Sequence, residues 1–213
     1  MRVLLACEES QALCMEFRKK GHEAFSADIL DCSGPYPEWH LRGDVLDLLN
    51  KNWDLMIAFP PCTHLAVSGA RHFKQKILDG RQQQGIDFFM EMVNAPIPKI
   101  AIENPIGIMS TLYQKPNQII HPYHFGDPYS KSTCLWLKNL PALNYNRKYD
   151  DGSKNLQKEL VNENLPTEVD RGEFVTFSSG KRMAKWYSEA SGNGHLRSKT
   201  FAGIAKAMAE QWG

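Results

Sequence analysis

The sequence of 213 residues predicts an α/β fold with a mostly parallel sheet and helices on both faces. Three observations predict it. Short apolar runs alternate along the chain with amphipathic helical stretches, which is typical of parallel sheets. Apolar residues make up 42% and charged residues 23%, an ordinary composition for a globular protein. The length suits one domain whose core needs no disulfide or metal.

The N-terminal segment predicts a β-α-β unit. Residues Val3–Ala6 form a short apolar run, so we expect a buried strand there. A helical stretch follows, for which Ser10 is the expected N-cap and Gly21 the expected C-terminal cap. The segment EAFSADI (23–29) then predicts a second strand.

The same alternation continues along the chain. The segments DLMIAF (54–59), KIAIEN (99–104) and TCLWLK (133–138) predict strands. GIDFFMEMV (85–93) and SKTFAGIAKAMAEQW (198–212) place their apolar residues on one helical face and predict helices.

One long polar segment breaks the pattern. Residues 144–180 are rich in Asn, Asp, Lys and Gly and show no sustained period, so we expect an irregular excursion. We therefore predict one main domain, made of residues 1–143 and 185–213. A short polar insertion at 144–184 interrupts it.

Polar groups follow three of the predicted strands, in ACEES, FPPCTH and IENP. Because the carboxyl ends of parallel strands meet at one edge of a sheet, Cys62 and Glu103 could face a common cleft. Cys62 could be a packing residue, a metal ligand or a nucleophile. Two prolines end the strand rigidly before it, and nearby positive charge such as Arg71 favours a thiolate nucleophile. The pair Cys62-x-His64 alone supplies too few ligands to indicate a metal site.

Glu103 is either a solvated strand end or a group that exchanges a proton with a ligand. In a partly apolar cleft a carboxyl group can serve as acid or base. A cysteine that adds to a ring carbon, next to an acid that protonates a ring nitrogen, is the pair that activates a pyrimidine.

Three motifs in the same order resemble those of the DNA (cytosine-5) methyltransferases. They are FPPCTHLAVSG (59–69), IENP (102–105) and SGNG (191–194). The N-terminal LLACEESQALCMEFRKKGHEAFSADI and the later GDVLDL (43–48) resemble the family's cofactor-binding segments. The short recognition region is similar to that of a small phage or bacterial type.

The resemblance implies a Rossmann-like, S-adenosylmethionine-dependent methyltransferase fold that methylates C5 of cytosine in DNA. Cys62 would attack cytosine C6 and form a covalent adduct. Glu103 would protonate N3, and Asn104 would hold the loop. The target base would be flipped out of the duplex.

The resemblance also implies a set of cofactor contacts. Asp28 would bind the cofactor ribose, Asp44 the adenine amine, and Asn193 would tie the last motif to the pocket. Ala6, Glu8 and Pro60 complete the expected cofactor-binding set. The sequence CEES stands where the family has a glycine-rich loop.

Net charge is +1, so any contact with DNA must come from local clusters of basic residues. Two such clusters flank the motifs, at 70–81 and 181–199. An ordinary solvated surface is an equal alternative for both. The expected DNA contacts are Arg71, Lys131, Lys181, Arg182, Lys185 and Arg197.

Two other functions stay open at this point. One is C5 modification of a free nucleotide or of an already modified base, and the other is nucleic-acid binding without catalysis. The five cysteines include no C-x-x-C pair, and no signal-peptide pattern begins the chain, so we expect a cytoplasmic protein without a metal. No apolar run approaches the ~20 residues that a membrane span needs.

Overall fold

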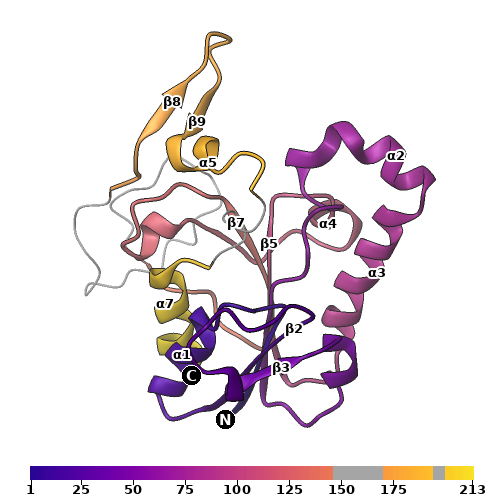
Figure 1. Cartoon of the computed structure of the whole chain (residues 1–213), viewed down its shortest axis with the longest axis vertical. Helices are drawn as coiled ribbons and strands as arrows, with labels where there is room; N and C mark the ends of the chain where they lie inside the picture. The colour runs from indigo at the N-terminus through magenta and orange to yellow at the C-terminus, as the bar shows by residue number, and fades with distance from the viewer. Residues whose placement is uncertain (146–169, 194–199) are drawn as a thin grey trace.

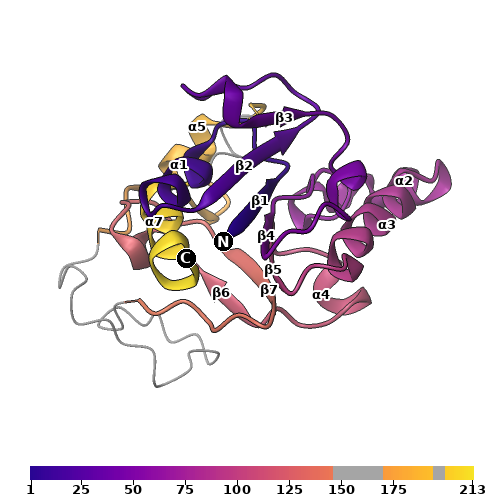
Figure 2. The ribbon, with the colours of Figure 1, turned by 90° about the horizontal axis from the view of Figure 1, so that it is seen from below.

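The structure is a computed structural model that describes residues 1–145, 170–193 and 200–213. Its described residues, drawn as a ribbon in Figure 1, form a seven-stranded sheet in the order β3-β2-β1-β4-β5-β7-β6, which can be followed in Figure 2. β1 to β5 run parallel to one another, whereas β7 is antiparallel to both β5 and β6. The strands are β1 (Arg2–Ala6), β2 (Glu23–Asp28), β3 (His40–Arg42), β4 (Leu55–Ala58), β5 (Lys99–Pro105), β6 (Gln118–Ile120) and β7 (Thr133–Lys138).

Helices cover both faces of this sheet. α1 (Ala12–Lys19) and α7 (Ala202–Trp212) lie side by side on one face (Figure 2), where Phe17 and Met208 join a buried cluster with Leu5 of β1. α3 (Arg81–Asn94) covers the other face, where Phe89 joins a second cluster with Leu4. Neighbouring residues of β1 thus point to opposite faces, as a strand buried on both sides requires.

The predicted fold class is confirmed. A mostly parallel sheet between two layers of helices is the Rossmann-like arrangement that the methyltransferase resemblance implies. In the described part of the chain, no helix has the length and apolar character to cross a membrane. The shorter elements are α2 (Phe73–Leu78), α4 (Met109–Leu112), α5 (Lys185–Glu189), and the 3-10 segments η1 (Pro37–Trp39), η2 (Val45–Leu48), η3 (Val67–His72) and η4 (Pro122–Phe125).

The predicted strands and the three predicted helices are all present, with shifted ends. α3 begins at Arg81, four residues before the predicted segment. The prediction of Ser10 as the N-cap of α1 is wrong, because Gln11 takes that position with a φ of 62°. Gly21 has a φ of 83° just after the C-cap Lys20, so its predicted place at the helix end is confirmed.

The polar excursion is less irregular than predicted. β8 (Phe174–Thr176) pairs with β9 (Arg182–Ala184) in an antiparallel hairpin, and α5 follows directly. The prediction of no regular structure up to residue 180 is therefore wrong for β8. The stretch 146–169 lies outside the described residues, and the proposed division into a main domain and an insertion stays a prediction.

The strand register sets where the functional loops lie. Ala6 at the end of β1 pairs with Ala27 of β2 and with Ala58 of β4, and Ala58 pairs with Ile102 of β5. The loops after these four strands therefore leave the sheet at the same edge. This edge is where ligands bind in folds of this class.

Candidate functional site

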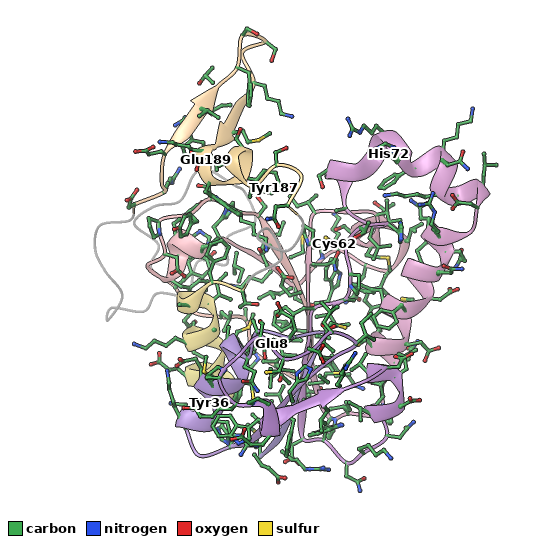
Figure 3. All side chains as sticks on the ribbon, viewed as in Figure 1. Glu8, Tyr36, Cys62, His72, Tyr187 and Glu189 are labelled. Carbon is green, nitrogen blue, oxygen red and sulfur yellow. The ribbon has the colours of Figure 1, made fainter. Side chains whose placement is uncertain are left out.

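The loop after β4 carries Cys62 and is held by backbone hydrogen bonds. The Cys62 carbonyl accepts from the N–H groups of Leu65 at 3.0 Å and Ala66 at 2.9 Å, which makes a tight turn. Cys62 itself is half-buried. Figure 3 shows it at the shared edge, between His72 on one side and Tyr187 on the other.

The loop after β4 is also tied to the neighbouring strand. Asn104 of β5 is buried, and its Nδ2 donates to the Pro60 carbonyl over 2.7 Å. The predicted role of Asn104, to hold the loop, matches this bond. Pro60 is buried as well, and its carbonyl oxygen is already occupied by the hydrogen bond from Asn104.

Glu103 precedes Asn104 and therefore faces the opposite side of the sheet. Its side chain is 16% exposed, and its Oε1 lies 3.8 Å from the Nζ of Lys131, whose side chain is 14% exposed. The structure thus brings together two predicted residues from distant parts of the sequence. The Lys131 ammonium also lies 5.8 Å from the ring centre of Phe201, beside α7.

A small hollow opens beside Glu103 and Lys131. Its volume of about 10 Å³ suits one water molecule, so its walls would have to move to admit a base. The buried hydroxyl of Thr133 in its wall has no hydrogen-bond partner within the described residues. The lining residues are Phe59, Glu103, Lys131, Thr133, Thr200, Phe201 and Ile204.

Glu8 follows β1 and is turned into the protein. Its carboxylate accepts from the backbone N–H groups of Leu13 at 2.6 Å and Cys14 at 3.2 Å, so it caps the N-terminus of α1. Burial raises the pKa of Glu8 to about 7, although these two bonds act in the opposite direction. In many folds of this class an anionic ligand group takes this position, and here the chain supplies the anion itself.

Two further predicted cofactor residues lie near the end of β1. Asp28 ends β2 and accepts from the Leu30 N–H at 2.9 Å, and Asp44 accepts from the Leu46 N–H at 3.0 Å. Burial, and then the charges of Asp28 and Asp44, raise the pKa of the Cys7 thiol to about 12. The three residues therefore share one acidic corner, made from the ends of β1 and β2 and the segment after β3.

For Ala6 and Asn193, which were also predicted to bind the cofactor, the structure gives backbone hydrogen bonds. Ala6 is fully buried, and its carbonyl accepts from the Phe59 N–H at 2.9 Å. Asn193 is exposed in the turn after α5, with its backbone N–H bonded to the Ala190 carbonyl.

Most of the predicted basic residues lie on two arms that project beyond the shared edge, the first of which is formed by η3 and α2. Arg71 is exposed near α2, and its Nε donates to the His72 Nε2 over 2.9 Å. On the other arm, formed by β8, β9 and α5, Lys181 and Arg182 are exposed. Figure 1 shows that the two arms rise from the same side of the sheet, at opposite flanks.

Lys185 and Arg197 are the remaining predicted DNA contacts. Lys185 forms an ion pair with Glu173 at 2.6 Å, which lessens the charge that it offers to a phosphate. Arg197 lies outside the described residues.

In the ranges that the structure describes, no group of three or more His, Cys, Asp or Glu side chains is placed to hold a metal ion.

Sequence reasoning missed two residues that contact the Cys62 loop. The Lys76 ammonium reaches the Thr63 carbonyl over 2.5 Å, and the Gln82 amide reaches the His64 carbonyl over 3.3 Å. Both side chains are more than nine-tenths buried. No sequence signal could have identified them, because Lys76 stands in the polar stretch KQK, which reads as an exposed helix surface.

Comparisons with known proteins give a distant likeness to solved structures. No protein-family model matches the chain, and no curated protein does. A similar solved structure, described as a DNA modification methyltransferase encoded within a prophage of E. coli, is 18% identical with a TM-score of 0.43. The match covers 63% of this chain and 45% of the other, so this chain spans less than half the length of that protein. A likeness of this extent does not identify an activity.

Proposed function

We propose that this protein is a small S-adenosylmethionine-dependent DNA methyltransferase that acts on C5 of cytosine through Cys62. One observation carries the proposal. Two adjacent parallel strands end at the same edge with a half-buried cysteine and a glutamate, and the buried Asn104–Pro60 bond holds the two ends together. A thiol and a carboxyl group on neighbouring strand ends are the two groups that addition to a pyrimidine ring uses, which supports the proposal.

Cys62 acts as the nucleophile in this proposal. Its thiolate adds to C6 of the flipped cytosine and forms a C–S bond, while the electrons of the C5–C6 double bond shift towards N3 and C5. The tight turn at Leu65 and Ala66 fixes the backbone from which the sulfur projects. A rigid nucleophile needs little reorganisation to reach the ring.

Glu103 acts at N3. It places a proton there as Cys62 adds, so that negative charge does not build up on the ring. The Lys131 ammonium at 3.8 Å orients the Glu103 carboxyl group and keeps positive charge beside the reacting ring. C5, made nucleophilic by this addition, would take the methyl group that bound S-adenosylmethionine supplies, with S-adenosylhomocysteine as the leaving group. Loss of the C5 proton to water, departure of the Cys62 thiolate and return of the N3 proton to Glu103 would then restore the aromatic ring with a methyl group at C5.

The acidic corner suits the proposed cofactor. S-adenosylmethionine supplies a methyl group on a positively charged sulfonium. Asp28 and Asp44 would hold its ribose hydroxyls and adenine amine, since carboxylates accept hydrogen bonds from both. Glu8 already accepts from the N–H groups of Leu13 and Cys14 at the start of α1, so these donors are not open to the phosphates of a dinucleotide.

A transfer assay tests the proposal. Purified protein, labelled S-adenosylmethionine and a cytosine-containing duplex should give labelled DNA, and Cys62→Ala should abolish the label. Cys32→Ala, at another half-buried cysteine, is the matched control and should retain transfer. Label on a free cytidine nucleotide but not on DNA would contradict the proposed substrate, and no label on either would contradict the activity.

A further inference from the structure

Lys76 is a buried cation on a helix that is otherwise largely exposed. It is the one buried residue of α2, with a relative exposure of 7%, and its neighbours Lys74 and Ile77 are exposed. Its ammonium crosses to the loop after β4 and donates to the Thr63 carbonyl at 2.5 Å. Thr63 directly follows Cys62, so this bond lies one residue from the proposed nucleophile.

The charge of Lys76 is costly at this place. Within the described residues no carboxylate lies in ion-pair range of its ammonium. A buried ammonium that has a carbonyl but no carboxylate partner loses hydration that is only partly replaced. A Met or Leu would fill the same space without this loss, so stability alone does not account for a lysine.

Other side chains hold the same loop from different elements. Gln82 of α3 donates to the His64 carbonyl, and Asn104 of β5 donates to the Pro60 carbonyl. The Leu65 carbonyl accepts from the Ile108 N–H at 3.0 Å. Carbonyls on both sides of Cys62 are therefore fixed, and among these donors Lys76 alone carries a charge.

The electrostatic reach of Lys76 extends along this loop. Burial, and next the charge of Lys76, lower the pKa of the His64 imidazole, with Arg81 adding to the effect. The ammonium therefore acts on Thr63 and His64 together, immediately after Cys62. Positive charge close to a thiol favours its thiolate form.

We propose that Lys76 is a positioning residue for Cys62, holding its loop through Thr63 and supplying the fixed positive charge beside it. This inference rests on the proposed function in that it takes Cys62 as the nucleophile. Lys76 does not touch the base or the cofactor in this account. It acts through the backbone and the electrostatic field of the loop.

Three substitutions of Lys76 separate the effect of its hydrogen bond to Thr63 from the effect of its charge. Lys76→Met removes both, Lys76→Gln keeps an N–H donor without charge, and Lys76→Arg keeps the charge. Lys74→Met is the matched control, because Lys74 lies two residues away on the exposed side of the same helix. Thermal unfolding of each variant checks that it is folded.

Two readouts follow each variant. The first is kcat and KM for methyl transfer, where Lys76→Met should lower kcat about 10- to 100-fold, the loss expected from a small misplacement of a reacting group. KM for S-adenosylmethionine should not change, and Lys76→Arg should recover most of kcat. The second is the rate of iodoacetamide labelling of Cys62 against pH, measured by peptide mapping. Its midpoint should move to higher pH in Lys76→Met and Lys76→Gln only.

If folded Lys76→Met and Lys76→Gln keep the kcat and the labelling profile of the unchanged protein, the inference is overturned. If Lys76→Met does not fold, the result for Lys76→Gln decides alone. Labelling needs neither DNA nor cofactor. A shifted labelling profile in a protein that transfers no methyl group would therefore contradict the proposed function and leave the placement of Lys76 standing.

Discussion

At the scale of single residues, the candidate site consists of a cysteine and a glutamate that come from neighbouring strand ends, for which we propose the roles of nucleophile and acid. The sequence indicated Cys62, Glu103 and Asn104, because Cys62 follows one buried strand, Glu103 and Asn104 end another, and a proline stands close to each. The Glu103–Lys131 contact was not predicted, because the sequence indicated Lys131 only as a DNA contact. The bond from Asn104 to Pro60 needs coordinates, since 44 residues separate the partners.

Substitution of Glu103 separates catalysis from cofactor binding. Glu103→Gln should lower methyl transfer about 100-fold or more, because the amide cannot give a proton to N3. Calorimetry should show unchanged binding of S-adenosylmethionine. Glu91→Gln, on the exposed side of α3, is the control and should change neither quantity. Equal loss of transfer and binding in Glu103→Gln would contradict the proposed role.

Glu8 should make stability depend on pH. Its pKa is about 7 in the folded protein and 4.5 without burial, so the folded state retains a proton that the unfolded state has lost between these values. The contribution of Glu8 to the free energy of unfolding should therefore be fully present below about pH 4.5 and fall as pH rises to about 7, by on the order of 1.4 kcal/mol per pKa unit.

Urea unfolding of Glu8→Gln beside the unchanged protein measures this contribution. The difference in unfolding free energy between the two should change from pH 5 to pH 8, with the unchanged protein losing stability relative to the variant. Curves that stay parallel over this range would show that the Glu8 carboxyl group titrates alike in both states.

At the scale of elements, local patterns predicted the long segments well and the short ones poorly. Apolar runs identified β1, β2, β4, β5 and β7 because burial on both faces leaves a continuous signal. β3, β6 and β8 have three residues each and carry no such signal. Gln11 is the N-cap of α1, and its buried side chain bonds to the backbone of Tyr36 through both its amide N–H and its amide carbonyl, a contact that no local pattern contains.

The link between β4 and β5 can be tested through Asn104. Asn104→Ala leaves the buried Pro60 carbonyl without its donor, so the free energy of unfolding should fall by about 1–3 kcal/mol. Methyl transfer should fall as well, since the Cys62 loop loses one of its anchors. Asn94→Ala, at an exposed helix end, should change neither value, and an Asn104→Ala protein as stable as the original would exclude this anchoring role.

At the scale of the whole molecule, the two arms place positive charge on either side of the shared edge. A net charge of +1 gave no sign of a nucleic-acid partner, and only the folded chain shows where the basic residues lie. Arg71 lies on one arm, and Lys181 and Arg182 lie on the other (Figure 1). This arrangement fits a bound duplex whose backbones run along the arms while one base reaches Cys62.

Salt dependence tests this arrangement. If Lys181 contacts a phosphate, Lys181→Ala should weaken DNA binding uniformly across sequences and reduce the slope of log affinity against log salt by about 1. Lys20→Ala, exposed at the far end of α1, is the control and should leave the slope unchanged. Equal slopes for both variants would remove the β8–β9 arm from the DNA interface.

The central claim is that Cys62 adds covalently to a cytosine ring, and one measurement tests it most directly. A duplex with 5-fluorocytosine is incubated with the protein and S-adenosylmethionine, and the products are mapped by mass spectrometry. Because fluorine at C5 cannot leave as a proton does, the account predicts a stable protein–DNA adduct on the peptide that contains Cys62. Methyl transfer to normal DNA without any adduct at Cys62 would contradict the account.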